Sequence, residues 1–356
     1  MSCQALSLTD IRIAPQSRSL FASMKKALIT GLTGQDGSYL AELLLAKGYQ
    51  VFGLVRRSSG GNLDRVGHLG DRIQVLSGDL LDQTSLMDVI SIAQPDEIYN
   101  LASQSYIPTS WTQPALTAEY TALGVSRLLE AIRRCQPDAR FYQASSSEVF
   151  GAPDIAPQDE RTAFRPRNPY GVAKAYAHWM TANYRTQYNL YACCGITYTH
   201  ESPRRSAEFV FRKITRTAAQ IKLGLATELK LGNLDARRDW CYAKDAVAAM
   251  WLMLQQQEPD DYIIASGETH SVRELVECAF NYVGLDWQQY VKVDPAFYRA
   301  DEPVQLVGNI DKIQTKLNWQ PEYSFSQLVE LMLESDLQQL GQDSIDPNIR
   351  LVSQLN

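Results

Sequence analysis

The chain has no apolar run that approaches the ~20 consecutive residues of a membrane-spanning helix. Its six cysteines include no C-x-x-C pair, and no cysteine–histidine cluster has the spacing of zinc ligands. Residues 1–23 lack the long apolar stretch of a secretory signal, and we expect a poorly ordered extension or an upstream alternative start. These absences argue against a membrane protein, a secreted disulfide-rich protein and a metal site, and they favour a cytoplasmic protein with reduced thiols.

Internal repeats and low-complexity tracts are also lacking. The 356 residues suit one large or two modest domains, and the 45% hydrophobic and 21% charged residues are ordinary for a soluble globular protein. The net charge of -6 argues against nucleic acid as a partner. A nucleotide ligand remains compatible with this charge, because helix N-termini and local cations bind phosphate whatever the total charge.

Short apolar runs alternate with amphipathic segments through the first half of the chain. This rhythm predicts an α/β fold, namely a Rossmann-type, doubly wound parallel sheet with helices on both faces. A ligand should then bind beyond the carboxyl ends of the strands. The predicted strands are 27–30, 50–55, 73–76, 97–102, 140–145 and 192–198, and the predicted helices are 38–46, 84–92, 118–133 and 170–187.

The rhythm changes after His200, which predicts a second, smaller α/β domain for the substrate. This domain should be discontinuous, with residues from about 200–239 and from 266–345. The dinucleotide-binding domain should comprise 24–199 and about 240–265. The predicted elements of this half are helices 207–222, 245–255, 271–283 and 324–340 and strands 228–231 and 262–265.

A glycine-rich turn, Gly31-Leu-Thr-Gly34-Gln35-Asp36-Gly37, connects the first predicted strand with the first helix. Glycine permits a tight turn and a close approach of the backbone to a pyrophosphate, which would meet the N-terminus of the helix. Glycines also occur in ordinary turns, but the strand–turn–helix context predicts a dinucleotide site.

The second predicted strand ends in Arg56-Arg57-Ser58. An acidic residue at this place would bind the ribose 2′-hydroxyl of NAD, whereas two arginines favour the 2′-phosphate of NADP. A solvated basic turn is the alternative reading. We also expect cofactor contacts after the third and fourth strands, at Asp79, Leu80, Leu101, Ala102 and Ser103.

Tyr170 and Lys174 lie one turn apart on one face of a predicted helix. The ammonium should favour the phenolate and lower the Tyr170 pKa from ~10 toward the working pH, so that Tyr170 can act as a base. Ser146, at the end of the preceding strand, completes a set for hydride transfer. Hydride transfer does not require a carboxylate such as Glu148, which suggests that oxidation is the first step of a longer reaction. The alternative reading of Glu148 is an ordinary surface glutamate.

Several stretches together resemble the extended short-chain dehydrogenase/reductase family and, within it, the GDP-mannose 4,6-dehydratases. The likeness extends from about Lys25 to Asp336, and the run His200-Glu-Ser-Pro-Arg-Arg205 is more specific than the catalytic set. The other matching stretches are Thr30–Glu42, Gln94–Leu101, Phe141–Ser145, Pro169–Lys174, Arg212–Thr215 and Arg238–Asp245.

The resemblance implies the redox-neutral conversion of GDP-mannose into GDP-4-keto-6-deoxymannose and water, with NADP as cofactor. It implies that Ser146 takes the place usually held by threonine, that Tyr170 is the oxidation base with Lys174 as its partner, and that Glu148 is the acid/base. Tyr170, Lys174, His200 and Arg205 would also contact the cofactor. The residues implied for the nucleotide sugar are Glu201, Lys213, Arg238, Arg299 and Glu302.

The same residues leave other functions open. A 4-reductase or an epimerase acting on another nucleotide sugar would share the fold, although a reductase does not need Glu148. A non-catalytic NADP-binding sensor would more often lack Tyr170 or Lys174. The loop 58–68 is similar to a family loop that reaches across a subunit interface, which implies a homotetramer; Leu63 replaces the customary threonine in it.

Overall fold

The computed structural model describes residues 24–56, 63–297 and 305–345. The predicted extension 1–23 and the predicted site residues Arg57, Ser58, Arg299 and Glu302 lie outside these ranges. Among the described helices, none is long and apolar enough to cross a membrane.

Seven parallel strands form the central sheet, in the order β11-β6-β5-β4-β1-β2-β3. The direction of winding reverses between β1 and β4, and in such sheets the ligand binds at this switch point. The strands are β1 (Lys26–Thr30), β2 (Gln50–Val55), β3 (Ile73–Ser77), β4 (Glu97–Asn100), β5 (Arg140–Ala144), β6 (Ala192–Thr197) and β11 (Tyr262–Ile264).

Helices cover both faces of the sheet, as alternation of buried side chains along the strands requires. Ala27 and Ile29 of β1 pack in one core with α1 (Gln35–Ala46) and α8 (Ala243–Met253). Leu28 points to the other core, which contains side chains from α2 (Gln83–Ala93), α5 (Gly124–Cys135) and α6 (Pro169–Tyr188). The predicted Rossmann-type fold is therefore confirmed.

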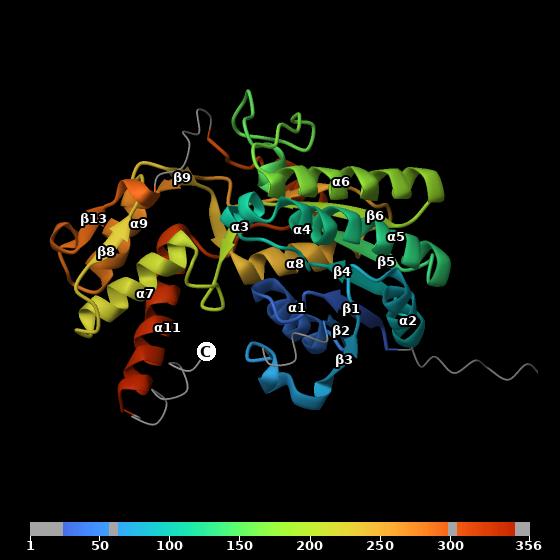
Figure 1. The fold of residues 1–356 in the computed structure, drawn as a ribbon, viewed down its shortest axis with the longest axis horizontal. Helices are drawn as coiled ribbons and strands as arrows, with labels where there is room; N and C mark the ends of the chain where they lie inside the picture. Colours follow the sequence, from blue (N-terminus) through green and yellow to red (C-terminus); the bar gives the residue numbers. More distant parts are fainter. Residues whose placement is uncertain (1–23, 57–62, 298–304, 346–356) are drawn as a thin grey trace, which may run out of the picture.

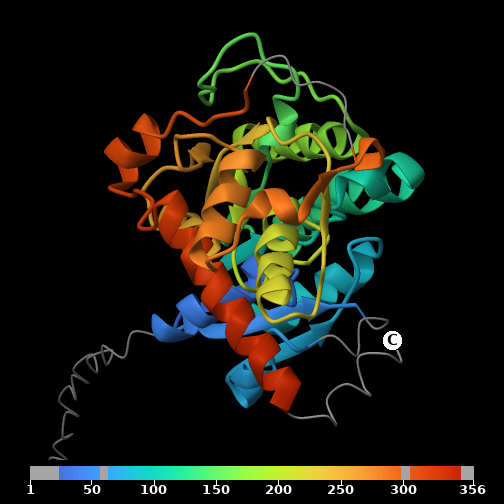
Figure 2. The same ribbon diagram turned by 90° about the vertical axis from the view of Figure 1, so that its left-hand side faces the viewer.

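A second domain lies beside the carboxyl ends of the strands (Figure 1). Figure 2 shows it facing the viewer, with α11 running across it. It has a core of its own, which includes Phe211, Trp240 and Phe280. Its helices and strands are α7 (Val210–Lys222), α9 (Val272–Tyr282), α11 (Phe325–Ile345), β8 (Leu229–Leu231) and β13 (Val291–Val293), and the short connecting strands are β7 (Thr199–Glu201), β9 (Arg237–Arg238), β10 (Trp240–Tyr242) and β12 (His270–Ser271).

One segment of the predicted second domain, residues 311–319, packs against the first domain instead. Helix α10 (Asp311–Leu317) contributes Ile313 and Leu317 to the core of the first domain, together with Trp319. The Trp319 indole is buried there and donates a hydrogen bond of 3.0 Å to the carbonyl oxygen of Asp245. These apolar side chains are thus buried with those of α8, although the sequence predicted that 266–345 belongs to the second domain.

Three α-helices, among them α10, and one irregular turn were absent from the sequence-based expectation. The helix predicted at 118–133 is preceded by α3 (Ile107–Thr112) and α4 (Pro114–Ala118) and is interrupted by a π-helical turn at Glu119–Leu123. A π-helical turn widens the helix and often occurs at a functional site. Here it borders the cavity described next.

Candidate active site

The glycine-rich turn after β1 packs directly on the turn after β4. Gly31 has a φ of +74°, and a Cβ atom at this position would lie 2.8 Å from the backbone nitrogen of Ala102. No side chain caps the N-terminus of α1, where Gly34 occupies the capping position, so its first backbone N–H groups remain available to a ligand. These features fit the pyrophosphate of a dinucleotide.

A single cavity of about 1420 Å³ extends from this turn to the second domain. Its volume exceeds the roughly 300–1,000 Å³ of a usual small-molecule site, so it has room for two ligands. All predicted site residues within the described ranges border it: Gly31, Gly34, Gln35, Asp36, Gly37, Arg56, Asp79, Leu80, Leu101, Ala102, Ser103, Ser146, Glu148, Tyr170, Lys174, His200, Glu201, Arg205, Lys213 and Arg238.

The four predicted catalytic side chains come from the end of β5 and the start of α6. The Ser146 hydroxyl accepts a hydrogen bond of 3.3 Å from the backbone nitrogen of Glu148 in a short 3-10 turn. Asn168, which caps α6, donates its side-chain amide to the Glu148 carboxylate at 2.7 Å. Asn168 therefore ties the carboxylate to the helix that carries Tyr170 and Lys174, a contact that the sequence did not reveal.

Close backbone packing brings these two segments together. A Cβ atom on Gly171 would lie 2.6 Å from the carbonyl oxygen of Glu148, so any larger residue would push α6 away from the turn. Ser146, Tyr170 and Lys174 are each less than a tenth exposed. Glu148 thus lies beside the buried set for hydride transfer, within one cavity.

Burial dominates the ionisation of the pair on α6. It raises the pKa of Tyr170, while the hydrogen-bonding Ser146 side chain acts in the opposite direction. Burial also lowers the pKa of Lys174 to about 8. The prediction that Lys174 brings the Tyr170 pKa down to the working pH is wrong for this structure, because the ammonium lies 5.6 Å from the ring centre and donates to the Ala144 carbonyl at 2.7 Å.

Arg56 borders the part of the cavity near the end of β2 and is held by a residue that the sequence analysis missed. Its guanidinium donates a hydrogen bond of 3.1 Å to the hydroxyl of Tyr120 and lies 5.2 Å from the centre of that ring. Tyr120 belongs to the π-helical turn, and no sequence signal marks such a turn. The contact with Tyr120 thus keeps the Arg56 guanidinium at the edge of the cavity.

Gln35 and Asp36 connect the glycine-rich turn with β7. The His200 ring nitrogen Nε2 lies 2.7 Å from the Asp36 carboxylate, and the Gln35 amide donates to the His200 carbonyl at 3.1 Å. Burial alone would lower the pKa of His200, but the neighbouring Asp36 carboxylate outweighs it and raises that pKa. These side chains therefore join the two domains at the cavity.

The second domain supplies cations to the far end of the cavity. Arg205 stacks 3.5 Å from the centre of the Phe209 ring and forms an ion pair of 3.4 Å with the buried Glu201. Lys213 donates to the Lys230 carbonyl at 2.7 Å. Arg238 lies on β9, and its neighbour Arg237, which the sequence analysis did not single out, also borders the cavity. Such a group of cations suits the phosphates of a nucleotide.

Comparisons with known proteins agree with this geometry. The family model for GDP-mannose 4,6 dehydratase matches residues 28–332. GDP-mannose 4,6 dehydratase 1 of Arabidopsis thaliana is 48% identical over 326 residues, which cover 88% of this chain and 90% of that protein. GDP-mannose 4,6 dehydratase of Cricetulus griseus is 48% identical over 341 residues, which cover 88% of this chain and 92% of that protein.

A solved structure shares the whole architecture. RMD from Pseudomonas aeruginosa, complexed with NADPH, superposes with a TM-score of 0.74 at 25% identity and covers 88% of this chain and 100% of its own. Family model, relatives and fold thus lead to one assignment: the chain belongs to the GDP-mannose 4,6-dehydratase family.

Proposed function

We propose that the protein is an NADP-dependent hydro-lyase that converts GDP-mannose into GDP-4-keto-6-deoxymannose and water. The observation that carries this proposal is Glu148, a carboxylate that borders the same cavity as Tyr170 and Lys174 and is fixed by Asn168 at 2.7 Å. A 4-reductase needs no such acid, and an epimerase would not release water. Membership of the family and the names of the relatives support dehydration over both.

The side chains of the chain can balance the protons of this reaction. Tyr170, in its ionised form, would remove the proton of the C4 hydroxyl, and Glu148 would remove the C5 proton, which the new 4-ketone makes acidic. Glu148 would then give its proton to the departing C6 hydroxyl, which leaves as water. The proton held by Tyr170 balances the one that C5 regains, so both side chains return to their starting states.

Bound NADP would accept the hydride from C4 and return it to C6. The turn from Gly31 to Gly37 would hold the pyrophosphate of NADP, and Arg56 would bind the 2′-phosphate. Lys213 and Arg238 would hold the nucleotide sugar at the other end of the cavity, and Arg205 would contact the cofactor. Tyr170 and Lys174 border the same cavity as these two groups of residues, which supports a reaction between the two ligands.

The test is incubation of the purified protein with GDP-mannose and NADP, followed by mass spectrometry of the nucleotide sugar. Loss of about 18 Da marks dehydration, while an unchanged mass with a changed configuration would indicate an epimerase. Unchanged GDP-mannose, despite measured binding of NADP, would favour a non-catalytic sensor and would contradict the proposal.

Replacing Arg56 by alanine is expected to weaken NADP binding about threefold to tenfold and to leave NAD binding nearly unchanged. The guanidinium would make a charge-assisted hydrogen bond to the 2′-phosphate, but it is exposed, so solvent screening limits the effect. Equilibrium titration with both dinucleotides measures the ratio of the dissociation constants for NADP and NAD. Arg161→Ala, which removes an exposed arginine paired with Asp159, is the control, and an equal loss for NADP and NAD would contradict the assignment.

The alkaline side of the pH profile should report Lys174. Its pKa of about 8 means that the ammonium loses its proton as the pH rises through this value, so we expect kcat/KM to fall above about pH 8. Lys174→Arg would keep a positive charge over this whole pH range. Its kcat/KM should therefore show no fall above about pH 8, even if the variant is slower than the unaltered protein. A profile that stays flat from about pH 7 to pH 10 in the unaltered protein would show that the charge of Lys174 does not contribute to the reaction.

We also propose a cytoplasmic homotetramer. The five described cysteines form no disulfide, which supports a reducing compartment. Trp111, Val172 and Trp179 are all more than half exposed, and two of them lie on α6, which supports burial of this face in a subunit interface. Light scattering that gives the mass of four 40.0 kDa chains would support the tetramer, whereas the mass of one chain would refute it.

A further inference from the structure

Three successive turns of α6 face the end of β5. Tyr170, Lys174 and a third residue, His178, are each four residues apart and therefore lie on one face of the helix. Tyr170 has the Ser146 side chain as its hydrogen-bonding neighbour, and Lys174 donates to the Ala144 carbonyl. The third turn contacts Ser145, which lies between Ala144 and Ser146 in the sequence.

His178 is that third contact. Its ring nitrogen Nδ1 lies 3.3 Å from the hydroxyl oxygen of Ser145. Ser145 borders the catalytic cavity, whereas His178 lies behind it, 5% exposed, with its ring against those of Phe164 and Trp179. Neither the hydride transfer nor the proton transfers proposed above use His178.

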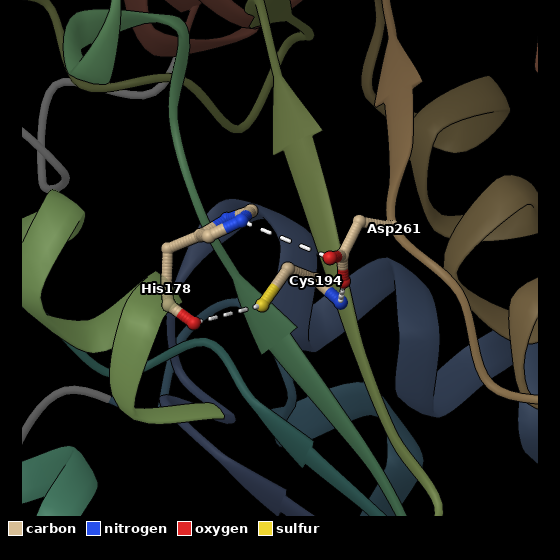
Figure 3. A group of neighbouring side chains, drawn as sticks. All are labelled: His178, Cys194 and Asp261. Carbon is tan, nitrogen blue, oxygen red and sulfur yellow. Dashed lines mark hydrogen bonds and ion pairs between the residues drawn. The ribbon is translucent and has the colours of Figure 1, made fainter. Parts of the chain in front are cut away.

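Asp261 favours one tautomer of this imidazole. Figure 3 shows the His178 ring pointing toward the Asp261 carboxylate, with a separation of 3.8 Å from Nε2. Arg185 holds the same carboxylate with two hydrogen bonds, of 2.9 and 2.7 Å. A carboxylate facing Nε2 favours the proton on that nitrogen, so Nδ1 is left as an acceptor and the Ser145 hydroxyl donates to it.

The residues in Figure 3 are of the types that bind metal ions, but the carboxylate among them is already paired with an arginine. The ligand atoms of His178, Cys194 and Asp261 lie within 4.8 Å of one another. Both carboxylate oxygens of Asp261 already accept hydrogen bonds from Arg185, and the Cys194 thiol donates to the His178 carbonyl at 3.8 Å. A metal cation would have to displace the guanidinium from a buried site, so these groups serve as a hydrogen-bonded support.

We propose that His178 is a positioning residue for the dehydration. Its Nδ1 accepts a hydrogen bond from the Ser145 hydroxyl, so that the Ser145 oxygen faces the cavity as a hydrogen-bond acceptor. The inference rests on the proposed function. The Ser145 backbone is already fixed by β6, through the Gly195 carbonyl at 2.9 Å and the Thr197 hydroxyl at 3.1 Å. His178 therefore determines the direction of the Ser145 hydroxyl, beside Ser146, rather than the path of the chain.

Two substitutions separate this role from packing. His178→Phe keeps a ring against Phe164 and Trp179 but loses the acceptor, and we expect kcat to fall about tenfold while KM for GDP-mannose changes less than about twofold. His178→Asn loses the ring, but its side-chain oxygen can accept from Ser145 in place of Nδ1. Recovery of most of kcat in His178→Asn is the expected result.

A double-mutant cycle tests the path through Ser145. Ser145→Ala should lower kcat as His178→Phe does, and the double variant should be no slower than Ser145→Ala alone, because both changes remove the same hydrogen bond. Additive losses would overturn the proposal. If His178→Phe is poorly folded, comparison of Ser145→Ala with the unaltered protein still tests whether the Ser145 hydroxyl contributes, because this change removes only one oxygen.

The acid side of the pH profile gives a second readout. Burial lowers the pKa of His178 below its usual value, Asp261 opposes this effect and Arg185 adds to it. The imidazole is therefore neutral at pH 7, and its protonation as the pH falls turns Nδ1 into a donor. Protonation of Glu148 also lowers kcat on this side, so we expect an acid limb in both proteins. The additional fall of kcat due to His178 should be present in the unaltered protein and missing in His178→Asn.

Thr181→Val is the matched control. Thr181 is buried on the next turn of α6, and its hydroxyl donates to the Ala177 carbonyl at 2.9 Å, four residues back on the same helix. It should leave kcat and the acid limb unchanged. Equal kcat in His178→Phe and the unaltered protein would overturn the role of His178, whereas absence of any dehydrated product from the unaltered protein would refute the proposed function instead.

Discussion

Glu148→Gln is expected to lower the release of the dehydrated sugar by about 10²- to 10⁴-fold while NADP still binds and the first oxidation still occurs. Glutamine keeps the size of the side chain and can still contact Asn168, but it can neither take the C5 proton nor give a proton to the C6 hydroxyl. The reaction should therefore halt at the 4-ketone.

Single-turnover absorbance at about 340 nm and mass spectrometry measure these two stages separately. Reduced cofactor should accumulate in Glu148→Gln, with no loss of water from the sugar. Glu160→Gln is the control, because the Glu160 carboxylate accepts a hydrogen bond from the Ile263 backbone at 2.9 Å and does not border the cavity. Release of the deoxy sugar at the unaltered rate would refute the acid/base role of Glu148.

Tyr170→Phe should block the reaction one step earlier, with a loss of about 10³-fold or more and no reduced cofactor in a single turnover. Phenylalanine fills the same buried space, so folding should be retained, but no group remains to take the C4 hydroxyl proton. The two variants thus differ in the intermediate at which they stop.

A matched tyrosine on the same helix provides the control. Tyr176 is 39% exposed, and its hydroxyl lies 3.1 Å from that of Ser126, outside the cavity lining. Tyr176→Phe should retain the rate of the unaltered protein. Accumulation of reduced cofactor by Tyr170→Phe would show that another group removes the C4 proton.

The sheet was predictable because its strands are short, buried, apolar runs. The run predicted at 192–198 is a strand at Ala192–Thr197, and the run predicted at 50–55 is a strand at Gln50–Val55. The short helices α3 and α4 each contain a proline in their first turn and carry too few residues to show a periodicity. The π-helical turn escaped prediction because its hydrogen-bond pattern leaves no distinct spacing of apolar residues.

The lining of the cavity was predictable where one segment supplies both residue type and spacing, as in the glycine-rich turn and at Tyr170 and Lys174. It was not predictable where the chemistry depends on contacts between distant segments. Asn168 meets Glu148 across twenty residues, and Tyr120 meets Arg56 across sixty-four. The pKa of Tyr170 was misjudged for a related reason, because the sequence reveals the neighbouring ammonium but not the extent of burial.

The division of labour around the cavity has an evolutionary consequence. Ser146, Glu148, Tyr170 and Lys174 all come from β5, α6 and the turn between them, whereas Lys213 and Arg238 belong to the second domain. If these residues act as proposed, mutations in the second domain can change the preference for base or hexose while the reaction chemistry of the first domain is left intact. Descendants of such a scaffold can diversify in substrate long before they change in mechanism.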